Sequence, residues 1–328
     1  MRIDVPLLLV LFALLVTVEI LRSSGYLDFV VSRSVARFRT TRGFAAALIV
    51  FSGALSSIVT NDVALFVVIP FTIIASRFSD FDVEDAVILE IIATNLIGCL
   101  TPLGNPQNLF VFHQSGWSAW QFIVTMLPFV GWCALGLVIA TFFLGPSRPM
   151  TRNEVELPPR NASAAFAGAF CLLLVILEVS RVLPAWIAAV AALVAGMQFL
   201  GRRLLRIDYS IIPIFCVAFL IIGWLQSAFT LRLPIGLYPA AIVLSQAISN
   251  VPATVLLAPF TTEWRELLYA VNAAGCGTII ASLANLLGWR IYVRESNRDA
   301  RFFRRLTAIN FVFLLWAAAG GWLLLKAQ

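Results

Sequence analysis

Apolar segments long enough to cross a lipid bilayer recur from one end of this 328-residue chain to the other. A bilayer core requires about 17–25 predominantly apolar residues per helix. Hydrophobic residues make up 61% of the chain and charged residues 12%, and the polar gaps are too short to hold a soluble domain. The sequence therefore predicts an all-α polytopic membrane protein, with residues 1–328 forming one transmembrane domain.

We expect about eight membrane crossings and two hairpins, the latter at 43–76 and 235–261. The expected crossings lie near 5–22, 86–112, 118–144, 162–180, 184–200, 210–228, 267–289 and 306–325. The loops on one side then hold 18 of the 23 Lys and Arg residues, including the run from Arg290 to Arg305. By the positive-inside rule this side is cytoplasmic and both termini lie outside. The positive charge thus reflects topology, and no nucleic-acid partner is expected.

Two stretches in the first half of the chain match two stretches in the second half. "LSSIVTNDVALFVVIPF" (55–71) aligns with "LSQAISNVPATVLLAPF" (244–260), and "NLIGCLTPLGNPQNL" (95–109) aligns with "NAAGCGTIIASLANL" (272–286). The matches include Asn, Gly, Ser, Thr and Pro, whereas chance matches between apolar helices are dominated by Leu and Ala. Each half reads as helix, hairpin, interrupted helix, helix.

The crossing count gives the two halves opposite orientations, which predicts an inverted repeat with two re-entrant hairpins and two interrupted helices. Repeat 1 covers about 5–144 and repeat 2 about 206–326, and residues 145–205 form a linker and scaffold helices. Such repeats are typical of secondary transporters, whose site lies at the repeat interface near the bilayer midplane.

The tips of the two hairpins carry the polar residues that the first aligned stretch brings into register. Thr60, Asn61 and Asp62 are expected to cap the second helix of the first hairpin, and Ser249 and Asn250 that of the second. Two helix N-termini facing inward offer N–H groups and partial positive charge to an anionic solute, while nearby carbonyl groups suit a small cation.

The interrupted helices supply the second set of candidate binding residues. The octet "TPLGNPQN" (101–108) has two prolines and a glycine in mid-crossing, so an unwound loop is expected. Its counterpart "TIIASLAN" (278–285) has no proline. The candidates in these loops are Thr101, Gly104, Asn105, Asn108, Thr278, Ser282 and Asn285.

Asp62 admits two interpretations from the residues alone. An acidic side chain at a helix N-terminus is stabilised by the helix dipole without any transport role. Alternatively, an ionisable group at membrane depth binds sodium or carries a proton, which places a Na⁺ site near Asn61, Asp62 and Gly104. Glu90 is a further acidic residue that we expect to line the same cavity.

The lone His113 is expected at the membrane interface, and the five cysteines are expected to be single buried packing residues.

Four motifs, "TNDVALFVVIP", "LTPLGNPQNLF", "LSQAISNVPATVLL" and "ASLANL", resemble those of the citrate-transporter-like (CitMHS) permeases of the ion transporter superfamily. This group includes divalent anion/sodium symporters, arsenite permeases of the ArsB type and sodium/proton antiporters of the NhaD type. The chain is most similar to short bacterial inner-membrane members, which implies a bacterial plasma (inner) membrane location.

The resemblance implies an elevator mechanism, commonly within a homodimer. In the carboxylate symporters both tips carry Ser-Asn-Thr, which binds the substrate carboxylate and sodium. This chain keeps Asn61 and Asn250 but places Asp62 and Val251 at the threonine positions. An Asp at the first tip is more similar to the antiporter and arsenite branches.

The sequence thus predicts an ion-coupled secondary active transporter of a small anionic solute, of the carboxylate or oxyanion class. No enzyme is expected, because no nucleophile triad, phosphate loop or zinc cluster is present, and the only expected cofactor is Na⁺ or H⁺ as coupling ion. The alternatives are a sodium/proton antiporter or arsenite-type permease using Asp62, and a non-transporting membrane subunit or sensor. The paired polar tips argue against the last.

Overall fold

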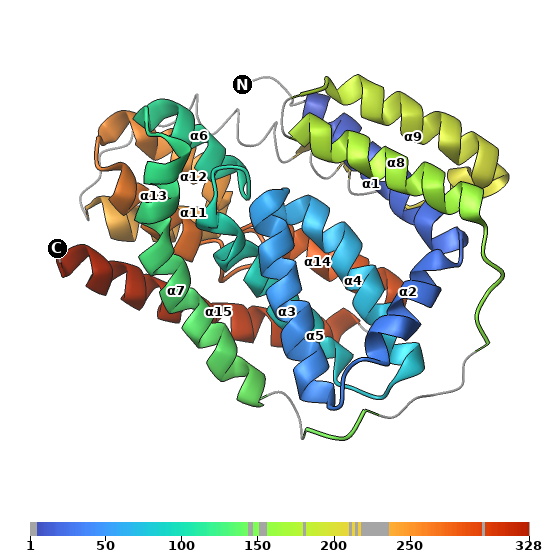
Figure 1. Ribbon diagram of the computed structural model, residues 1–328. Coiled ribbons are helices and arrows are strands. Elements are labelled where there is room, and N and C mark those ends of the chain that lie inside the picture. The colour runs from blue at the N-terminus through green and yellow to red at the C-terminus, as the bar shows by residue number, and fades with distance from the viewer. Residues whose placement is uncertain are drawn as a thin grey trace. The chain divides into compact units, whose positions relative to one another are not determined.

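The computed structural model describes residues 5–143, 147–150, 156–179, 182–209, 212–213, 216–217, 236–296 and 299–327. Within these ranges the chain is helical, with one isolated bridge between Thr40 and Pro149 and no strand. Figure 1 shows the helices in order along the chain. Most of the predicted crossing at 210–228 lies outside the described residues.

The helices divide into two compact units. The first unit comprises Met1–Phe38, Ile74–Asp80 and Met150–Phe229. Its described elements are α1 (Val5–Ser23), α2 (Tyr26–Val35), α8 (Ala162–Val179), α9 (Ala185–Phe199) and the 3-10 helix η2 (Gly201–Arg206). α1 packs against both α8 and α9 (Figure 1). Gly168 of α8 faces Leu21, and Gly196 of α9 faces Val16, so the absence of a side chain at both glycines lets the helices approach closely.

α2 lies where the sequence predicts only a loop, from 22 to 42. The apolar side chains of Val31 and Val35 are buried, which stabilises a helix in this stretch. Gly25 separates α2 from α1 with φ 69°, a left-handed conformation that glycine adopts without strain. The two helices are bent by 73° at this break and together have the length and composition of one broken span.

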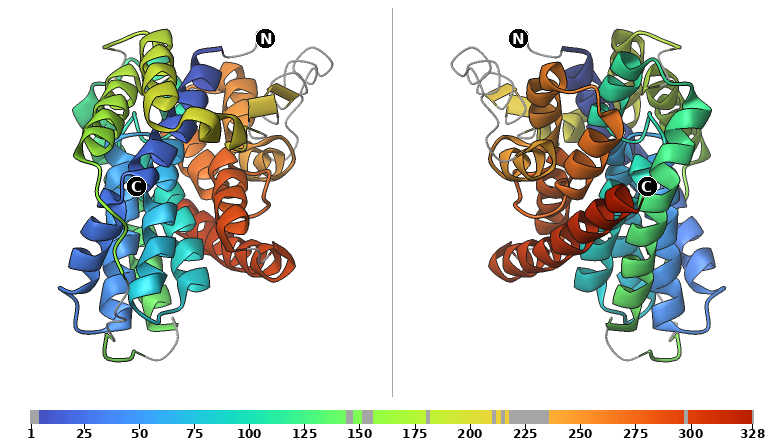
Figure 2. Two further views of the ribbon diagram at one scale, coloured as in Figure 1. Left: turned by 90° about the vertical axis from the view of Figure 1, so that its right-hand side faces the viewer. Right: turned by 90° about the vertical axis from the view of Figure 1, so that its left-hand side faces the viewer.

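The second unit comprises Arg39–Ile73, Phe81–Pro149 and Thr230–Gln328. Its first half contains α3 (Thr41–Ile58), most of α4 (Asn61–Phe78), α5 (Val83–Leu96), η1 (Gly98–Leu100), α6 (Pro106–Ser115) and α7 (Ala119–Phe143). Its second half contains α11 (Leu237–Ile248), α12 (Asn250–Leu257), η3 (Ala258–Phe260), α13 (Trp264–Ala273), α14 (Leu283–Ser296) and α15 (Asp299–Lys326). Figure 2 shows the long α15, in red, lying across α7, in green.

The described residues confirm a polytopic membrane protein. Four helices are long and apolar enough to cross a membrane, namely Thr41–Ile58, Asn61–Phe78, Ala119–Phe143 and Ala300–Lys326, and four shorter apolar helices accompany them. Both predicted hairpins are pairs of helices with a short break, and both predicted interrupted helices are broken in the polar stretches. α3 and α4 have 18 residues each, or about 27 Å at 1.5 Å per residue.

α7 and α15 are joined by a reciprocal pair of tryptophans. Trp132 Nε1 donates to the Trp316 carbonyl at 2.9 Å, Trp316 Nε1 donates to the Trp132 carbonyl at 3.0 Å, and the stacked rings lie 4.6 Å apart. Each indole lies over a glycine of the other helix, Gly136 under Trp316 and Gly320 under Trp132. The contact is therefore the same when the two helices are exchanged.

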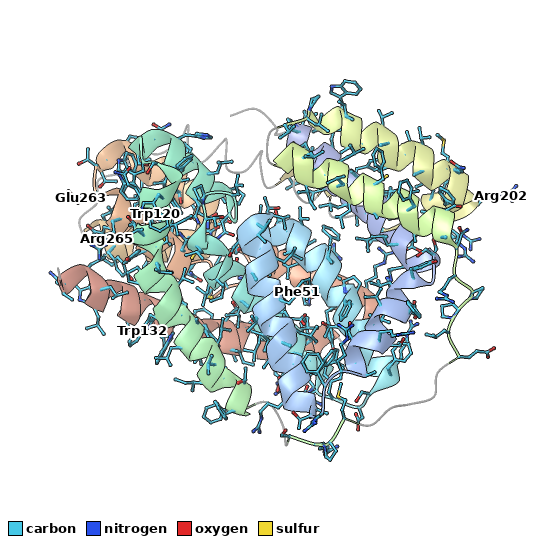
Figure 3. The ribbon with its side chains drawn as sticks, viewed as in Figure 1. Phe51, Trp120, Trp132, Arg202, Glu263 and Arg265 are labelled. Atoms are coloured by element: carbon cyan, nitrogen blue, oxygen red, sulfur yellow. The ribbon has the colours of Figure 1, made fainter. Side chains whose placement is uncertain are left out.

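The second unit exposes many large apolar side chains, as lipid contact requires. Trp120 is 73% exposed and Phe51 is 48% exposed, and both are labelled in Figure 3. The cysteine prediction is confirmed: all five thiols are free, and Cys99, Cys133, Cys171 and Cys276 are buried.

Candidate functional site

The first tip lies at the break between α3 and α4. α3 ends at Ile58, Val59 is extended, and α4 begins at Asn61. The Thr60 hydroxyl accepts from the Val63 N–H at 3.4 Å, as expected of a cap, and the Asn61 N–H donates to the Gly104 carbonyl at 2.9 Å. Asn61 and Asp62 are both buried. The tip is thus tied directly to the unwound loop of the first interrupted helix.

The second tip, between α11 and α12, has the same connection. The Asn250 N–H donates to the Ala281 carbonyl at 2.9 Å, and Ala281 belongs to the loop of the second interrupted helix. The expected side-chain cap at Ser249 is wrong, because its hydroxyl donates to the Ala281 carbonyl at 3.4 Å. Ser249 has φ 74°, a costly conformation for a residue with a Cβ, and it turns the side chain away from the helix.

The loops of the interrupted helices are closed by hydrogen bonds from the predicted residues. Thr101 donates to the Ser57 carbonyl at 2.6 Å, and Thr278 donates to the Gln246 carbonyl at 2.9 Å. Asn108 Nδ2 donates to the Thr101 carbonyl at 3.3 Å, and Asn285 Nδ2 to the Thr278 carbonyl at 3.2 Å. Each loop is therefore bonded to the helix that precedes its tip.

Gly104 is at the tightest point of the first loop. A Cβ on this residue would overlap the backbone carbonyl of Gly98 and also meet the Ser56 carbonyl. Only glycine therefore permits the close approach that presents the Gly104 carbonyl to Asn61.

Two asparagines that the sequence interpretation left out of the site link the two broken helices. Asn95, in the last turn of α5, donates through Nδ2 to Asn285 Oδ1 at 2.9 Å and accepts through Oδ1 from the Ser282 hydroxyl at 2.9 Å. Asn272, in the last turn of α13, donates through Nδ2 to Asn108 Oδ1 at 2.7 Å and accepts through Oδ1 from Asn105 Nδ2 at 3.3 Å. The signal was present in the sequence, because Asn95 and Asn272 align at the start of the second matched stretch.

These hydrogen bonds correspond position by position in the two halves of the chain. The two partners of Asn95 named above, Asn285 and Ser282, are the aligned counterparts of Asn108 and Asn105, which are the partners named for Asn272. Reciprocal contacts of this kind are those that a two-fold axis generates. All the predicted site residues lie in the second unit. Five of them bond to Asn95 or Asn272, namely Asn61, Asn105, Asn108, Ser282 and Asn285.

The correspondence ends at three buried oxygen atoms in the first half. Within the described part of the chain, Asn61 Oδ1, Asp62 Oδ1 and Asn105 Oδ1 have no hydrogen-bond partner. The aligned positions in the second half carry Asn250, Val251 and Ser282. None of these three side chains has a buried polar atom without a hydrogen-bond partner in the described part of the chain. Buried polar atoms without partners are costly, and carboxylate and amide oxygens are ligands that hard cations prefer.

Ion pairs in the second unit lie away from the tips. Arg305 pairs with Asp85 at 2.6 Å and with Glu84 at 3.6 Å, and Arg301 approaches Glu84 at 3.7 Å. Burial, reinforced by the nearby carboxylate of Asp82, raises the pKa of Asp85 to about 6 although Arg305 opposes the shift. Across the described ranges, no basic side chain forms an ion pair with Asp62.

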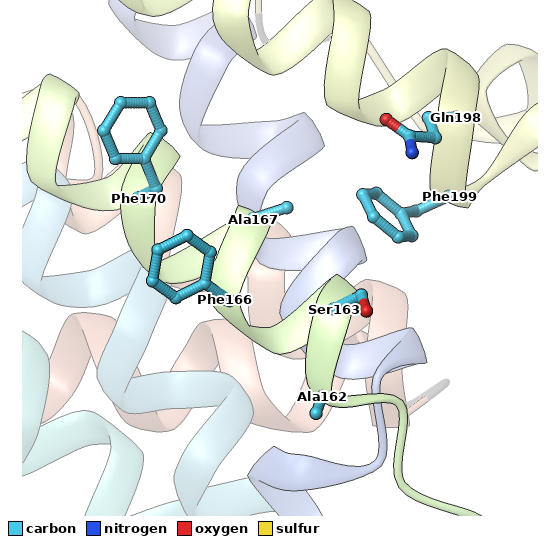
Figure 4. A pocket seen from close by; sticks show the side chains of 7 residues that line it. All are labelled: Ala162, Ser163, Phe166, Ala167, Phe170, Gln198 and Phe199. Atoms are coloured by element: carbon cyan, nitrogen blue, oxygen red, sulfur yellow. The ribbon is translucent and has the colours of Figure 1, made fainter.

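Two other features do not belong to this site. His113 is exposed in the last turn of α6. A cavity of about 550 Å³ in the first unit is lined mainly by apolar residues, among them Phe166, Phe170 and Phe199, with Ser163 and Gln198 as its polar members (Figure 4). It has no charged side chain to recognise an anion.

Comparison with known proteins defines the class as a multi-pass membrane transporter. The citrate transporter family model (CitMHS) matches residues 1–270. The chain is 34% identical to the inner membrane protein YbiR of Escherichia coli over 98% of its own length and 88% of the relative's. It is 32% identical to the uncharacterized transporter MJ0456 of Methanocaldococcus jannaschii, over 93% and 85% of the two lengths. The chain belongs to the citrate transporter family, as its four motifs indicated.

Proposed function

We propose that this protein is an ion-coupled secondary active transporter of a small anionic solute, of the carboxylate or oxyanion class. The observation that carries the proposal is the pair of buried tips at Asn61 and Asn250, each of which begins a helix and is bonded through its backbone N–H to a broken helix. These two N–H groups already donate to carbonyls of the broken helices, so the attraction for an anion would come from the partial positive charge of the two helix N-termini. The site would sit at the centre of an inverted repeat, and the reciprocal contacts of Asn95 and Asn272 support that arrangement.

The coupling cation would bind at the first tip. Asn61, Asp62 and Asn105 supply the oxygens without hydrogen-bond partners, and Asp62 adds a negative charge. A cation there would neutralise the carboxylate and favour the binding of an anion nearby. Sodium is the first candidate, and a proton on Asp62 is the alternative.

The second unit, which contains every site residue, would be the transport domain of an elevator mechanism. The first unit, with α8 and α9, would provide the scaffold and the contact of a homodimer in the bacterial inner membrane. Both termini would lie outside the cytoplasm.

The test is uptake into proteoliposomes of the purified protein. Radiolabelled di- and tricarboxylates, phosphate, sulfate and arsenite would be offered under an inward sodium gradient, an inward proton gradient and no gradient. We expect gradient-dependent uptake of at least one anion by the wild type and its loss in Asn61→Ala. Absence of gradient-dependent flux for every solute in a preparation that is folded by circular dichroism would refute the proposal.

A sodium/proton antiporter is the second candidate, and the orphan carboxylate oxygen of Asp62 is the observation that favours it. In that case a sodium pulse moves protons in vesicles without any solute, and Asp62→Asn abolishes the movement. The matched control is Asn310→Asp, which adds a carboxyl group to a buried site on α15 and leaves Asp62 intact. Unchanged exchange in Asp62→Asn would exclude this mechanism.

A further inference from the structure

Glu90 is a buried carboxyl group in the middle of α5 that the proposed cation site does not use. Its exposed fraction is 0%, and it lies five residues after Asp85 and five residues before Asn95. At 1.5 Å per residue, each interval is about 7.5 Å along the helix axis. Glu90 therefore stands between the ion pairs at the start of α5 and the asparagine network at its end.

A single polar side chain contacts the Glu90 carboxyl group. The Thr72 hydroxyl of α4 donates to Oε1 at 2.6 Å, and Oε2 has no partner among the described atoms. The flanking residues of α5, Leu89 and Ile91, are apolar and buried. One hydroxyl group is too few ligands for a hard cation, which takes about six oxygens.

The charged residues on the neighbouring helices leave Glu90 without a counter-ion. The charged side chains that the structure describes on those helices are Arg42 (α3), Asp62 and Arg77 (α4), Arg265 and Glu266 (α13), Arg290 and Arg294 (α14), and Arg301, Arg304, Arg305 and Lys326 (α15). Of the ion pairs and hydrogen bonds found in the described ranges, none joins any of these residues, or the titratable Cys99, Cys133, Tyr269 and Tyr292, to Glu90. An isolated carboxylate at such a depth is costly unless a proton neutralises it.

The matched half of the chain indicates that packing does not require this carboxyl group. When the two alignments are extended without a gap beyond the matched stretches, Glu90 falls opposite Leu267 of α13, which is fully buried, and Thr72 falls opposite Thr261. The corresponding helix position thus holds an apolar side chain, Leu267, in the second half of the chain and a carboxyl group, Glu90, in the first half. The acid in the first half is, like Asp62, a departure from the repeat.

We propose that Glu90 is a proton-binding site, held in orientation by Thr72 and separate from the cation-binding oxygens at the first tip, through which proton movement is coupled to transport. The coupling part of this inference rests on the proposed function. Binding of the proton to Glu90 does not.

The binding test uses purified full-length protein in detergent and pH-induced infrared difference spectroscopy. Wild type should show a carbonyl band of a protonated carboxylic acid that shifts in heavy water and disappears as the pH is raised. Glu90→Gln should remove the component of this band that belongs to Glu90 and lower the proton release in a parallel titration by one proton per chain. Thr72→Val should keep the band and shift its frequency, because the hydrogen bond to Oε1 is lost.

The matched control is Glu19→Gln, which removes a carboxyl group from α1 in the first unit and should leave the Glu90 band in place. If Glu90→Gln does not fold, Glu90→Leu provides the same test with the side chain that the aligned position already carries. If the Glu90 variants keep the full wild-type band, or if Glu19→Gln loses the same component, the proposal is overturned.

The coupling test uses proteoliposomes that contain a pH-sensitive dye. We expect Glu90→Gln to slow solute-driven proton movement at least tenfold, while solute-induced thermal stabilisation is kept. If wild type transports with sodium alone and Glu90→Gln is unchanged, the coupling role is refuted and the proposed function stands. If the band titrates but no solute drives flux, proton binding stands and the proposed function fails.

Discussion

Replacement of Asn95 by Ala tests whether the asparagine network holds the two broken helices together. The Asn95 side chain makes three hydrogen bonds, with Asn285 at 2.9 Å, Ser282 at 2.9 Å and Asn61 at 3.3 Å. Each is worth about 0.6–1 kcal/mol inside a membrane protein. Removal of all three therefore costs about 2–3 kcal/mol.

The matched control is Asn310→Ala in α15. Asn310 is also buried, but within the described part of the chain its side chain makes one hydrogen bond, to the Leu306 carbonyl of its own helix. We expect this change to cost about 1 kcal/mol or less. The difference between the two variants isolates the bonds that cross between helices from the general cost of truncating a buried amide.

The assay is unfolding of the purified protein in mixed micelles with increasing denaturing detergent, followed by tryptophan fluorescence. Asn95→Ala should unfold at a clearly lower detergent fraction than Asn310→Ala. Asn272→Ala should behave like Asn95→Ala, because the two residues have corresponding partners. Equal midpoints for Asn95→Ala and Asn310→Ala would refute the assignment of the network as the link between the broken helices.

Three further changes test other parts of the structure. The pKa of Asp85 in the folded protein is raised to about 6 from an ordinary value of 3.8, so the folded state binds more protons than the unfolded state between these values. The contribution of Asp85 to the free energy of unfolding therefore falls as the pH rises from about 4 to about 6. Urea or detergent unfolding midpoints should lose this pH-dependent component in Asp85→Asn, and an unchanged pH dependence would contradict the shift. Gly104→Ala should cost about 1–3 kcal/mol and abolish solute binding because its Cβ overlaps a backbone carbonyl, whereas Gly131→Ala, which meets nothing within 4 Å, should be neutral in the same thermal-shift assay. Trp132→Phe and Trp316→Phe should each lower stability by about 1 kcal/mol in the unfolding assay, since each removes one of two reciprocal hydrogen bonds, and a large inequality between them would argue against that symmetry.

Residue types alone determined much of the architecture. Runs of apolar side chains require helices in lipid because backbone groups find no other partners there, and the proline-rich octet forced a break between α5 and α6. The aligned stretches predict the position of both tips, at Asn61 and Asn250. The family assignment followed from the same motifs and is confirmed.

The sequence did not reveal α2 or the conformation of Ser249. The stretch 22–42 carries several arginines, which favoured a cytoplasmic loop. Its helix α2 is stabilised because Val31 and Val35 are buried in the folded unit. The positive φ at Ser249 depends on the contact with Ala281, a residue 32 positions away. Local propensity carries no information about such distant partners.

The tertiary structure also decided which polar residues meet. The alignment of Asn95 with Asn272 marks both residues as part of the repeat, but it does not show that each bonds to the other half of the chain. Glu90 was expected to share the cavity of the tips, but its hydrogen bond goes to Thr72. Sequence fixes the period and polarity of each helix, whereas the partners of a buried side chain depend on the packing of helices that lie far apart along the chain.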